Sequence, residues 1–452
     1  MLVQQTNPVR LTYIEVGALM LTGRTGDQAL VREINLSIIL NALRDHSPIS
    51  RASLAAVTGL NKTTVSSLVQ QLTDARFVSQ VGVDKTEDTG RPGILLELNP
   101  GAGCIIGAEI GVDFVSVIIT NFAIETIWRH YESTNLRDGQ ASILKTTLDT
   151  IRKGIRKTKD QCGKILGLGL GVPGLVDVSS GQLLFAPNLR WQDVPLRKML
   201  EREFDFPIYV DNEANMAALA ESYFGVARGS RSVLYVSAGV GLGGGIVLDG
   251  RILPGAAGFT GEVGHMTIDP QGQQCNCGNK GCWETLVSQG ALFDRVRKAI
   301  AGGKTSKLTE YTGGDLDSLT VPLVARAAGE KDQVALDALN ETGVYLGIGL
   351  ANLVNALNPE IVVFGGILSV ASEFLVPVIK RIISERALQW SVEQMQVLVA
   401  SHGLDACAMG GIASVYHQVL SQPFKSARTN NGGNRKEQVF TRRGGEAMAN
   451  NA

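Results

Sequence analysis

The sequence is sparing in cysteine, in aromatic residues and in net charge. Its 452 residues include 6 cysteines and 6% aromatic residues, and its formal net charge is −1. A chain without excess positive charge has no global attraction to nucleic acid or to an anionic membrane, so any nucleic-acid binding has to come from a local surface. No apolar run reaches the roughly 18 residues of a membrane span.

An N-terminal secretory signal is also missing. The stretch LTYIEVGALML is interrupted by Glu15, and no small-residue cleavage site follows it. We therefore expect a cytoplasmic protein with no membrane partner. In a reducing compartment, clustered thiols are more often metal ligands than disulfides.

Glycine and apolar residues are plentiful. The 52 glycines and 44% hydrophobic residues are typical of an α/β protein with many strand–turn–helix junctions. The length predicts two or three domains. We divide the chain into a lead-in segment at 1–31, a small module at 32–99, a larger unit at 100–421 and a polar tail at 422–452 that we expect to be disordered.

Residues 32–99 have the pattern of three helices followed by a strand pair. In REINLSIILNALRDH, apolar residues recur at i, i+3, i+4 and i+7, as in an amphipathic helix. Ser50 is the predicted N-cap of a short helix, RASLAAVTG, that ends at Gly59, and LNKTTVSSLVQQLTDA follows at once. Two short strands around a polar tip complete a winged helix-turn-helix. The predicted buried positions are Leu36, Ile39, Leu40, Leu43, Val65, Leu68, Val69 and Leu72.

The third helix of this module presents a short, hydroxyl-rich face. Side chains of this kind reach base edges and phosphates in a major groove. No acidic residue occurs between His46 and Thr73. In the wing, an arginine flanked by glycine and proline is thin enough to enter a minor groove. The alternative is a three-helix packing module that contacts a partner protein. The candidate DNA-binding residues are Arg51, Lys62, Thr63, Thr64, Ser66, Ser67 and Arg91.

Strands and helices alternate along residues 100–421. CIIGAEIGVDFVSVIIT has the pattern of two buried strands, YVDNEANMAALAESYFG that of a strand, a polar loop and a helix, and SVLYVSAGVGLGGGIVLDGRIL that of a strand hairpin. The helix ALNETGVYLGIGLANLVNALN leads into the strand PEIVVFGG. Two such halves in sequence imply an α/β fold with two lobes and a cleft between them.

Half of the cysteines lie in one stretch, CNCGNKGCWE, downstream of a histidine in GEVGH. His265, Cys275, Cys277 and Cys282 give the spacing H-x9-C-x-C-x4-C. Three thiolates and one imidazole form a closed tetrahedral set for zinc, and a closed set indicates a structural ion rather than a catalytic one. The alternative is reduced, buried cysteines. That alternative is our interpretation of the cysteines that lie singly in apolar segments, Cys104, Cys162 and Cys407.

Carboxylates flank this metal pattern. Glu262 lies three residues before the histidine, and Glu284 lies two residues after the last cysteine. Fixed carboxylates accept hydrogen bonds from vicinal hydroxyls, and DNEAN adds Asn212 and Glu213. Together these residues predict a monosaccharide site, although each acid taken alone is more often a solvated surface group.

Residues 32–421 resemble the ROK family (repressor, open reading frame, kinase), most closely its xylose-repressor and glucose- or N-acetylglucosamine-repressor branch. The motifs are GEVGH, CNCGNKGCWE, GVPGLVD, VDNEAN, GVGLGGGIVLDGRILPGAAG and NPEIVVFGG. The resemblance implies the two-lobed actin/hexokinase fold and zinc at the histidine and the three cysteines. The residues that it implies for the sugar site are Asn188, Asn212, Glu213, Glu262, His265 and Glu284.

The family also contains sugar kinases, and this chain departs from them at the reacting centre. Kinase members carry D-x-G-G-T after the first strand, where EIGVD has Val112 for the second glycine and Asp113 for the threonine. A valine side chain blocks close backbone approach to a phosphate, and a carboxylate repels it. Glu213 stands at the position of the kinases' catalytic aspartate, and its extra methylene displaces the carboxylate.

Kinase members also lack the winged helix, so we expect a repressor without enzymatic activity. The alternatives are an ATP-dependent sugar kinase with an appended DNA-binding module, and a DNA-binding activator with a degenerate sugar site. In the expected mechanism a monosaccharide, xylose or a hexose, closes the cleft and releases operator DNA from a homodimer or homotetramer. Helix-turn-helix dimers read palindromes, so we expect an inverted-repeat operator. NEAN resembles the loop of xylose repressors, which favours a pentose. A phosphorylated sugar is disfavoured, because the sequence has no basic cluster near the predicted pocket.

Overall fold

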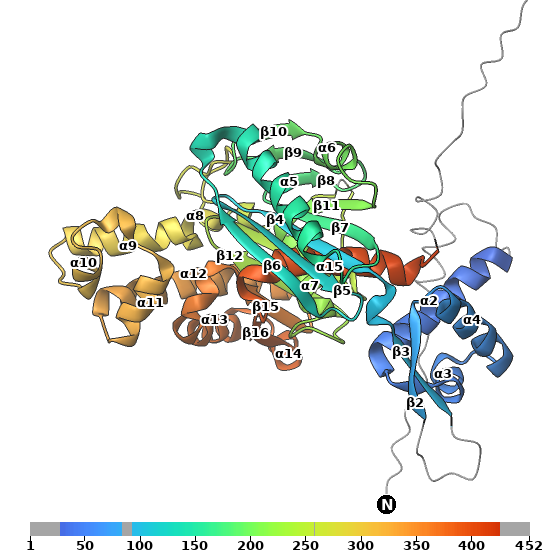
Figure 1. The fold of residues 1–452 in the computed structure, drawn as a ribbon. Coiled ribbons are helices and arrows are strands. Elements are labelled where there is room, and N and C mark those ends of the chain that lie inside the picture. The colour runs from blue at the N-terminus through green and yellow to red at the C-terminus, as the bar shows by residue number, and fades with distance from the viewer. Residues whose placement is uncertain (1–27, 84–92, 257, 425–452) are drawn as a thin grey trace, which may run out of the picture.

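The computed structural model describes residues 28–83, 93–256 and 258–424, and it shows a small N-terminal module beside a larger two-lobed unit (Figure 1). Among the described residues, no helix is both long enough and apolar enough to cross a membrane.

The N-terminal module contains the three helices and the strand pair that the sequence predicts, and a third short strand extends the pair to a three-stranded sheet. Ser50 caps the second helix by accepting a hydrogen bond from the Ser53 backbone N–H at 3.2 Å, and Gly59 ends that helix with a φ of 71°. Asn61 caps the third helix through the Thr64 backbone N–H at 2.8 Å. The predicted apolar positions are all buried. The elements are α2 (Gln28–His46), β1 (Ile49–Ser50), α3 (Arg51–Thr58), α4 (Lys62–Asp74), β2 (Val78–Val83) and β3 (Ile94–Leu98).

The ends of the chain differ in part from the sequence-based expectation. Helix α2 begins at Gln28, inside the predicted lead-in segment, and the short strand β1 pairs with β3 where the sequence predicts only a break. In the predicted tail, the Phe424 ring lies 6.4 Å from the Phe77 ring. The rest of the lead-in and of the tail, together with Arg91 in the wing, lies outside the described residues.

The first lobe is built on a mixed five-stranded sheet in the order β11-β7-β4-β5-β6. The two strands predicted in CIIGAEIGVDFVSVIIT form the antiparallel pair β4 and β5, and β4 also pairs parallel with β7. Helix α5 packs on β5 and β6, and a small sheet, β10-β9-β8, adjoins β11. The elements are β4 (Cys104–Ile110), β5 (Phe114–Asn121), β6 (Thr126–Ser133), α5 (Gly139–Thr158), β7 (Ile165–Val172), β8 (Leu175–Asp177), β9 (Gln182–Ala186), β10 (Trp191–Val194), α6 (Leu196–Glu201) and β11 (Ile208–Asn212).

The second lobe has its own five-stranded sheet, in the order β14-β13-β12-β15-β16. The predicted hairpin is β12 and β13, and β12 pairs parallel with β15, the strand predicted in PEIVVFGG. Helices surround a large apolar core on this lobe. The elements are β12 (Ser232–Ala238), β13 (Leu242–Leu248), β14 (Arg251–Ile252), α8 (Glu284–Val287), α9 (Gln289–Ala301), α10 (Lys307–Tyr311), α11 (Val321–Gly329), α12 (Gln333–Leu357), β15 (Ile361–Gly365), α13 (Ser372–Arg386), α14 (Gln389–Gln394) and β16 (Gln396–Val399).

Two helices, α7 (Glu213–Tyr223) and α15 (Ala406–Ser421), lie between the lobes. Helix α15 packs on β4 and β7 of the first sheet, α7 packs on β12 and β13 of the second, and the two helices pack on each other. Their approach is close, because a Cβ on Gly410 would lie 1.7 Å from the Met216 carbonyl oxygen. Residues 214–222 of α7 are all buried, so this helix is enclosed on every side.

The prediction that Cys104 and Cys162 are separate core cysteines is wrong. They form a disulfide, although 58 residues separate them in the sequence. The parallel pairing of β4 with β7 places Cys104 opposite Ile165, just beyond Cys162, and this pairing brings the two sulfurs together. Cys407 is a buried free cysteine, as predicted.

Candidate functional site

The four predicted metal ligands lie together. The ligand atoms of His265, Cys275, Cys277 and Cys282 fall within 4.8 Å of one another. Cys275 Sγ lies 3.8 Å from His265 Nδ1, and Cys277 Sγ lies 3.6 Å from Cys282 Sγ. A tetrahedral zinc ion with bonds of about 2.3 Å spaces its sulfur ligands about 3.8 Å apart. The donor types and their spacing therefore fit a four-coordinate zinc ion.

Glycine shapes the loop that carries the three cysteines. Gly278 and Gly281 have φ angles of 94° and 68°, which side chains other than glycine rarely adopt. A Cβ on Gly281 would lie 1.6 Å from the Asp269 carbonyl oxygen. A side chain at position 281 would therefore push the loop open and separate the ligands.

His265 connects the metal ligands to the predicted sugar site through its two ring nitrogens. Nδ1 faces Cys275, whereas Nε2 lies 3.7 Å from Glu262 Oε2. A histidine that ligates a metal through one nitrogen is oriented by the partner of the other. One imidazole can thus serve both sets to which the sequence assigned it.

Glu284 lies between Cys275 and the start of β13, and its two carboxylate oxygens contact one each. Its Oε2 accepts a hydrogen bond from the Leu242 backbone N–H at 2.9 Å, and its Oε1 lies 3.8 Å from Cys275 Sγ. A Cβ on Gly241 would lie 2.6 Å from Glu284 Oε2 and 3.4 Å from Asn188 Nδ2. Asn188 and Glu284 therefore converge on the glycine turn between β12 and β13.

Glu213 stands at the centre of these groups, at the N-terminus of α7. Burial is the main cause that raises the pKa of Glu213 to about 7, and the negative charges of Glu262 and Glu284 add to it. Its Oε2 is buried and has no hydrogen-bond partner among the described residues. A buried carboxylate oxygen without a partner is suited to accept a hydrogen bond from a ligand hydroxyl.

Asn212 uses its side chain within the protein. Oδ1 accepts from the Ala214 backbone N–H at 2.7 Å, which caps α7, and Nδ2 donates to the Gly174 carbonyl oxygen at 2.9 Å. The cap fixes the start of α7 and with it the position of Glu213, the first residue of that helix. Direct contact between Asn212 and a sugar stays a prediction.

Glu109 belongs to the same buried acidic region, and the sequence-based candidate set omits it. Burial, followed by the charge of Glu213, raises the pKa of Glu109 to about 8, while a hydrogen bond with Cys407 opposes the shift. The available signal was an acid within the apolar strand CIIGAEI. Because Glu109 lies on β4 and Glu213 on α7, only the tertiary fold brings the two carboxyls close together.

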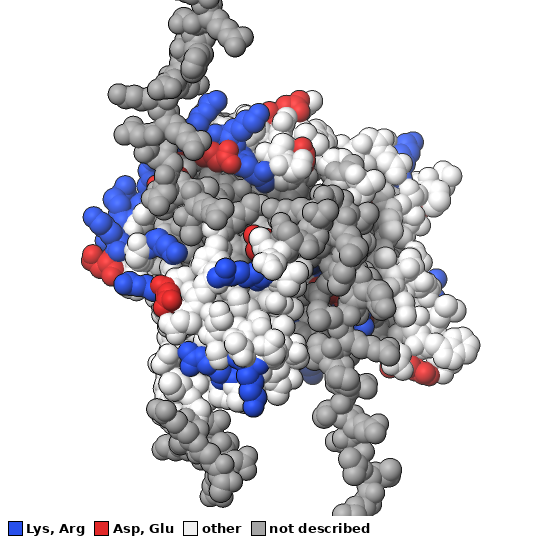
Figure 2. All heavy atoms as spheres, turned by 90° about the vertical axis from the view of Figure 1, so that its right-hand side faces the viewer, with Lys and Arg blue, Asp and Glu red and all other residues white. Residues whose placement is uncertain are grey.

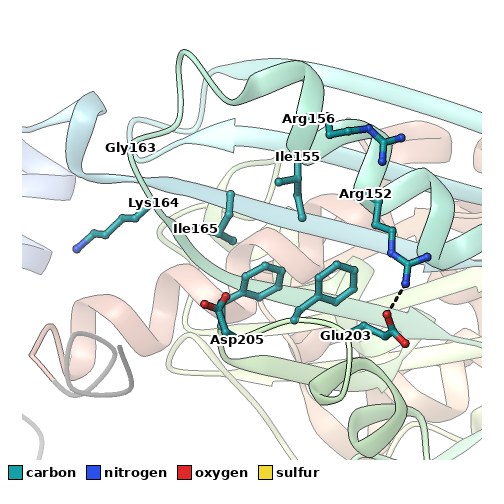
Figure 3. Close-up of a pocket in the computed structure, with 10 residues that line it drawn as sticks. Arg152, Ile155, Arg156, Gly163, Lys164, Ile165, Glu203 and Asp205 are labelled. Carbon is teal, nitrogen blue, oxygen red and sulfur yellow. Dashed lines mark hydrogen bonds and ion pairs between the residues drawn. The ribbon is translucent and has the colours of Figure 1, made fainter. Parts of the chain in front are cut away.

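Two hollows on the surface differ in their relation to these residues. One, of about 550 Å³, is lined by Asn188 and by Asn276 of the loop at Cys275–Cys282, so a ligand that contacts Asn188 has space on that side. Figure 3 shows the other, of about 570 Å³, between α5 and the segment at 203–206, with an ion pair of Arg152 and Glu203 at its side. No predicted site residue lines this second hollow, and we assign it no role in the site.

The candidate DNA face is exposed as the sequence predicts. Lys62, Thr63, Ser66 and Ser67 are exposed on α4, and Thr64 and Arg51 are half-buried. In Figure 2, which faces the N-terminal module, lysine and arginine side chains stand in separate groups with fewer acidic ones among them. This arrangement agrees with a local basic surface on a chain whose net charge is −1.

The fold defines the class of protein: a winged helix-turn-helix module joined to a two-lobed, actin/hexokinase-like domain. Residues 31–79 match the family model for winged helix-turn-helix DNA-binding, and residues 105–418 match the model for the ROK family. The chain belongs to the ROK family, as its motifs indicate.

Relatives with both repressor and kinase names are similar to this chain. A putative xylose repressor of Caldicellulosiruptor sp. (strain Rt8B.4) is 39% identical over 88% of this chain and 99% of its own length. A glucokinase of Halalkalibacterium halodurans is 35% identical over 68% of this chain and 93% of its own. A crystal structure of a ROK family transcriptional regulator, described as a homologue of the Escherichia coli MLC protein, is 27% identical, has a TM-score of 0.76 and covers 89% of this chain and 100% of that one.

Proposed function

We propose that this protein is a sugar-responsive transcriptional repressor, in which a sugar bound in the two-lobed domain releases the winged helix-turn-helix from operator DNA. The observation that carries the proposal is the group of partly buried carboxylates around Glu213, whose Oε2 is buried without a partner, in a chain that also has a DNA-binding module. The repressor relative matches a larger share of the chain than the glucokinase does, 88% against 68%.

The effector that we propose is a neutral monosaccharide, with D-xylose as the first choice. The proposed contacts are carboxylates, amides and one imidazole, and none of them is a lysine or an arginine that would neutralise a phosphate. Arg190 lines the hollow beside Asn188 but is not one of these contacts. The unpartnered Glu213 Oε2 supports a hydroxyl donor as ligand. Relatives that carry the name xylose repressor support the pentose. The proposed sugar-site residues are Asn188, Asn212, Glu213, Glu262, His265 and Glu284.

We propose that the Cys/His set holds a structural zinc ion. When bound, zinc would cross-link the loop at Cys275–Cys282 to His265. His265 and Cys275 in turn lie beside Glu262 and Glu284. With zinc bound, the loop at Cys275–Cys282 would hold Glu262 and Glu284 at a constant separation. Loss of a zinc ligand would remove this constraint.

The repressor is proposed to have no kinase activity. Val112 and Asp113 follow β4 where kinase members carry a glycine and a threonine, and Glu213 replaces their aspartate. Burial raises the pKa of Glu109 to about 8 and that of Glu213 to about 7, and the charges of neighbouring carboxylates add to both shifts, so a further anion such as a nucleotide phosphate is disfavoured beside them. The second candidate function, an ATP-dependent sugar kinase, is favoured by the glycine-rich GVGLGG turn and by the glucokinase relative.

DNA binding is proposed for the exposed face of α4, the start of α3 and the wing, in a homodimer or homotetramer that reads an inverted repeat. The domain division at 32–99 and 100–421 is part of this proposal. The proposed contacts are Arg51, Lys62, Thr63, Thr64, Ser66, Ser67 and Arg91.

Fluorescence anisotropy tests the proposal directly. The purified protein is titrated onto a labelled duplex from its own upstream region at constant physiological salt, and a panel of monosaccharides is then added. We expect tight sequence-specific binding that D-xylose reverses. Failure to bind several candidate operators, combined with sugar-dependent ATP turnover, would replace the repressor by the kinase.

A further inference from the structure

The DNA-binding module is packed into the two-lobed domain rather than tethered to it. Buried residues of both parts form one continuous apolar cluster, and α2 packs on α15. The Phe77 ring, directly before β2 of the module, lies 5.6 Å from the Phe122 ring, which lies 5.3 Å from the Tyr416 ring of α15. A displacement of α15 therefore changes contacts of the module directly.

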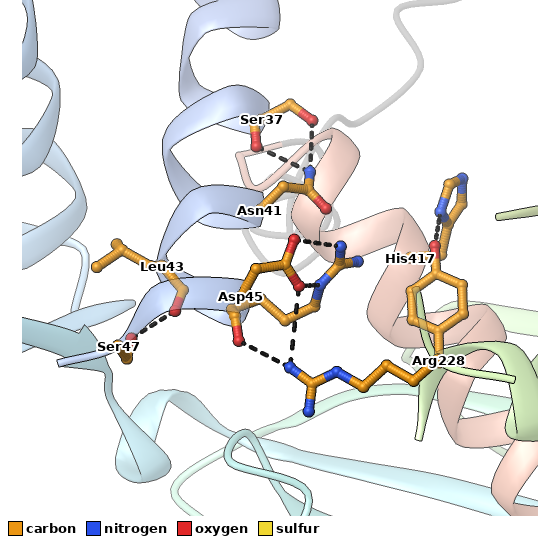
Figure 4. A network of polar contacts seen from close by, with 9 residues as sticks. Ser37, Asn41, Leu43, Asp45, Ser47, Arg228 and His417 are labelled. Carbon is orange, nitrogen blue, oxygen red and sulfur yellow. Dashed lines mark hydrogen bonds and ion pairs between the residues drawn. The ribbon is translucent and has the colours of Figure 1, made fainter. Parts of the chain in front are cut away.

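The C-terminal end of α2 also reaches α7. The Arg44 guanidinium lies over the Tyr223 ring, 5.4 Å from its centroid. Arg228, which follows α7, donates to the Arg44 carbonyl oxygen at 3.4 Å and lies 3.9 Å from Asp45 Oδ1 (Figure 4). The Tyr223 hydroxyl hydrogen-bonds His417 Nδ1 on α15. We call these five residues the junction, because they join α2 to both helices that lie between the lobes.

Helix α7 has its other end in the candidate sugar site. Glu213 is its first residue and Tyr223 its last, so about 15 Å of helix separates the site from the junction. In between, Glu221 ties α7 to the second lobe, because it accepts hydrogen bonds from the backbone N–H groups of Ser401 at 2.8 Å and His402 at 3.0 Å.

Glu221 is well suited to act as this tie. Its side chain is fully buried. Burial by itself would raise the pKa of Glu221, but the hydrogen bonds from His402 and Val226 lower it to about 2. It therefore stays ionised across the physiological range, and α7 follows the second lobe when that lobe moves.

We propose that α7 transmits the state of the sugar cleft to the DNA-binding module, and that Arg44 stacked on Tyr223 is the contact through which it acts. The inference rests on the proposed function, and it names the residues that couple sugar binding to DNA release. A ligand changes DNA affinity only when the two lobe states contact the module differently. Because α7 is short and enclosed, a displacement at Glu213 reaches Tyr223 with little bending. Arg44 and Tyr223 are positioning residues, since neither belongs to the proposed DNA or sugar contacts.

The test measures the coupling between the two ligands in the full-length protein. The affinity for the labelled upstream duplex is measured without and with saturating D-xylose, and the D-xylose affinity of the DNA-free protein is measured by calorimetry. For the wild type we expect the ratio of the two DNA dissociation constants to lie in the usual allosteric range of about 5- to 150-fold. In Arg44→Met, which keeps the apolar stem, we expect a ratio below about twofold, with the D-xylose affinity of the DNA-free protein unchanged.

Two further variants keep the result interpretable. Tyr223→Phe retains the ring under Arg44 and removes only the hydroxyl bonded to His417, so we expect an intermediate ratio. Arg152→Met is the matched control, because Arg152 forms surface ion pairs with Asp149 and Glu203, away from the junction. A melting scan checks folding, and if Arg44→Met does not fold, Tyr223→Phe decides.

The two possible failures can be told apart. A wild-type protein whose DNA binding ignores D-xylose would overturn the proposed xylose response, and this inference with it. A wild type that responds, with Arg44→Met or Tyr223→Phe responding equally well, would overturn the inference alone. Equal loss of coupling in Arg152→Met would also reject a specific role of the junction.

Discussion

A single side chain, Glu213, shows how burial sets the chemistry of this site. The carboxyl lies near other acids, and its pKa is raised to about 7 by burial and then by the charges of Glu262 and Glu284. The folded protein therefore binds a proton there that the unfolded chain has lost. Between pH 4.5 and about 7 the folded protein binds more protons at Glu213 than the unfolded chain does. The free energy of unfolding therefore falls as the pH rises through this range.

We predict that Glu213→Gln stabilises the sugar-free protein at pH 8 by about 1–3 kcal/mol, with the difference disappearing below the unfolded pKa. The same variant should bind D-xylose at least about tenfold more weakly, because the ionised carboxylate is the stronger acceptor. Wild-type D-xylose affinity should decline as the pH falls through 7, and the variant should show a flatter profile. Urea denaturation and calorimetry at several pH values measure both effects.

Glu201→Gln, an exposed acid at the end of α6, is the control and should change neither quantity. Equal stability of wild type and Glu213→Gln at pH 8 would show that burial does not raise the pKa of this carboxyl.

At the scale of elements, the loop at Cys275–Cys282 and helix α7 position the candidate sugar-site residues by different means. The loop depends on ligands that are close only because Gly281 lets the chain pass the Asp269 carbonyl oxygen. Helix α7 depends on its Asn212 cap and on close packing against α15. Loss of one metal ligand should therefore alter the loop and leave α7 in place.

We predict that Cys277→Ser lowers bound zinc below one equivalent and destabilises the protein by about 1–3 kcal/mol. DNA release by D-xylose should weaken because Glu262 and Glu284 lose their fixed separation. Elemental analysis, thermal melting and the anisotropy titration measure these three effects. The control is Lys280→Ala, an exposed residue of the same loop that is not in the ligand set. A normal D-xylose response by zinc-free Cys277→Ser would disprove the role of the ion.

At the scale of the whole molecule, the positive and negative charges nearly cancel, so DNA binding has to come from a local surface. The net charge is −1, and the stretch from His46 to Thr73 contains no acid. DNA binding should therefore depend on a few basic residues, and its salt dependence should report their number.

We predict that Lys62→Ala weakens operator binding at every sequence tested by a similar factor and reduces the slope of log Kd against log salt by about 1. The D-xylose affinity of the DNA-free protein should not change, because Lys62 lies on the exposed face of α4. Lys380→Ala, on an exposed position of α13 in the second lobe, serves as control. An unchanged salt slope in Lys62→Ala would remove this lysine from the DNA contacts.

Local features of the protein could be predicted from the sequence because they depend on neighbouring residues. Apolar spacing identifies α2 and α4. A side-chain cap at Ser50 and a left-handed glycine at Gly59 mark the ends of α3, and a polar turn between two apolar runs separates β4 from β5. The grouping of His265 with the three cysteines could be predicted for the same reason, since three of the four residues lie within one loop.

Contacts between distant segments could not be predicted in this way. The Cys104–Cys162 disulfide arises from the pairing of β4 with β7, and the raised pKa of Glu109 arises from its burial and then from the charge of Glu213 on a distant segment. The sequence by itself determined the helices of the module, most of the strands that carry the site, and which residue types are candidates for it. The tertiary structure alone decided which carboxyls share a cleft and that Arg44 meets Tyr223, because burial and contact between distant residues exist only once the lobes and the module have packed together.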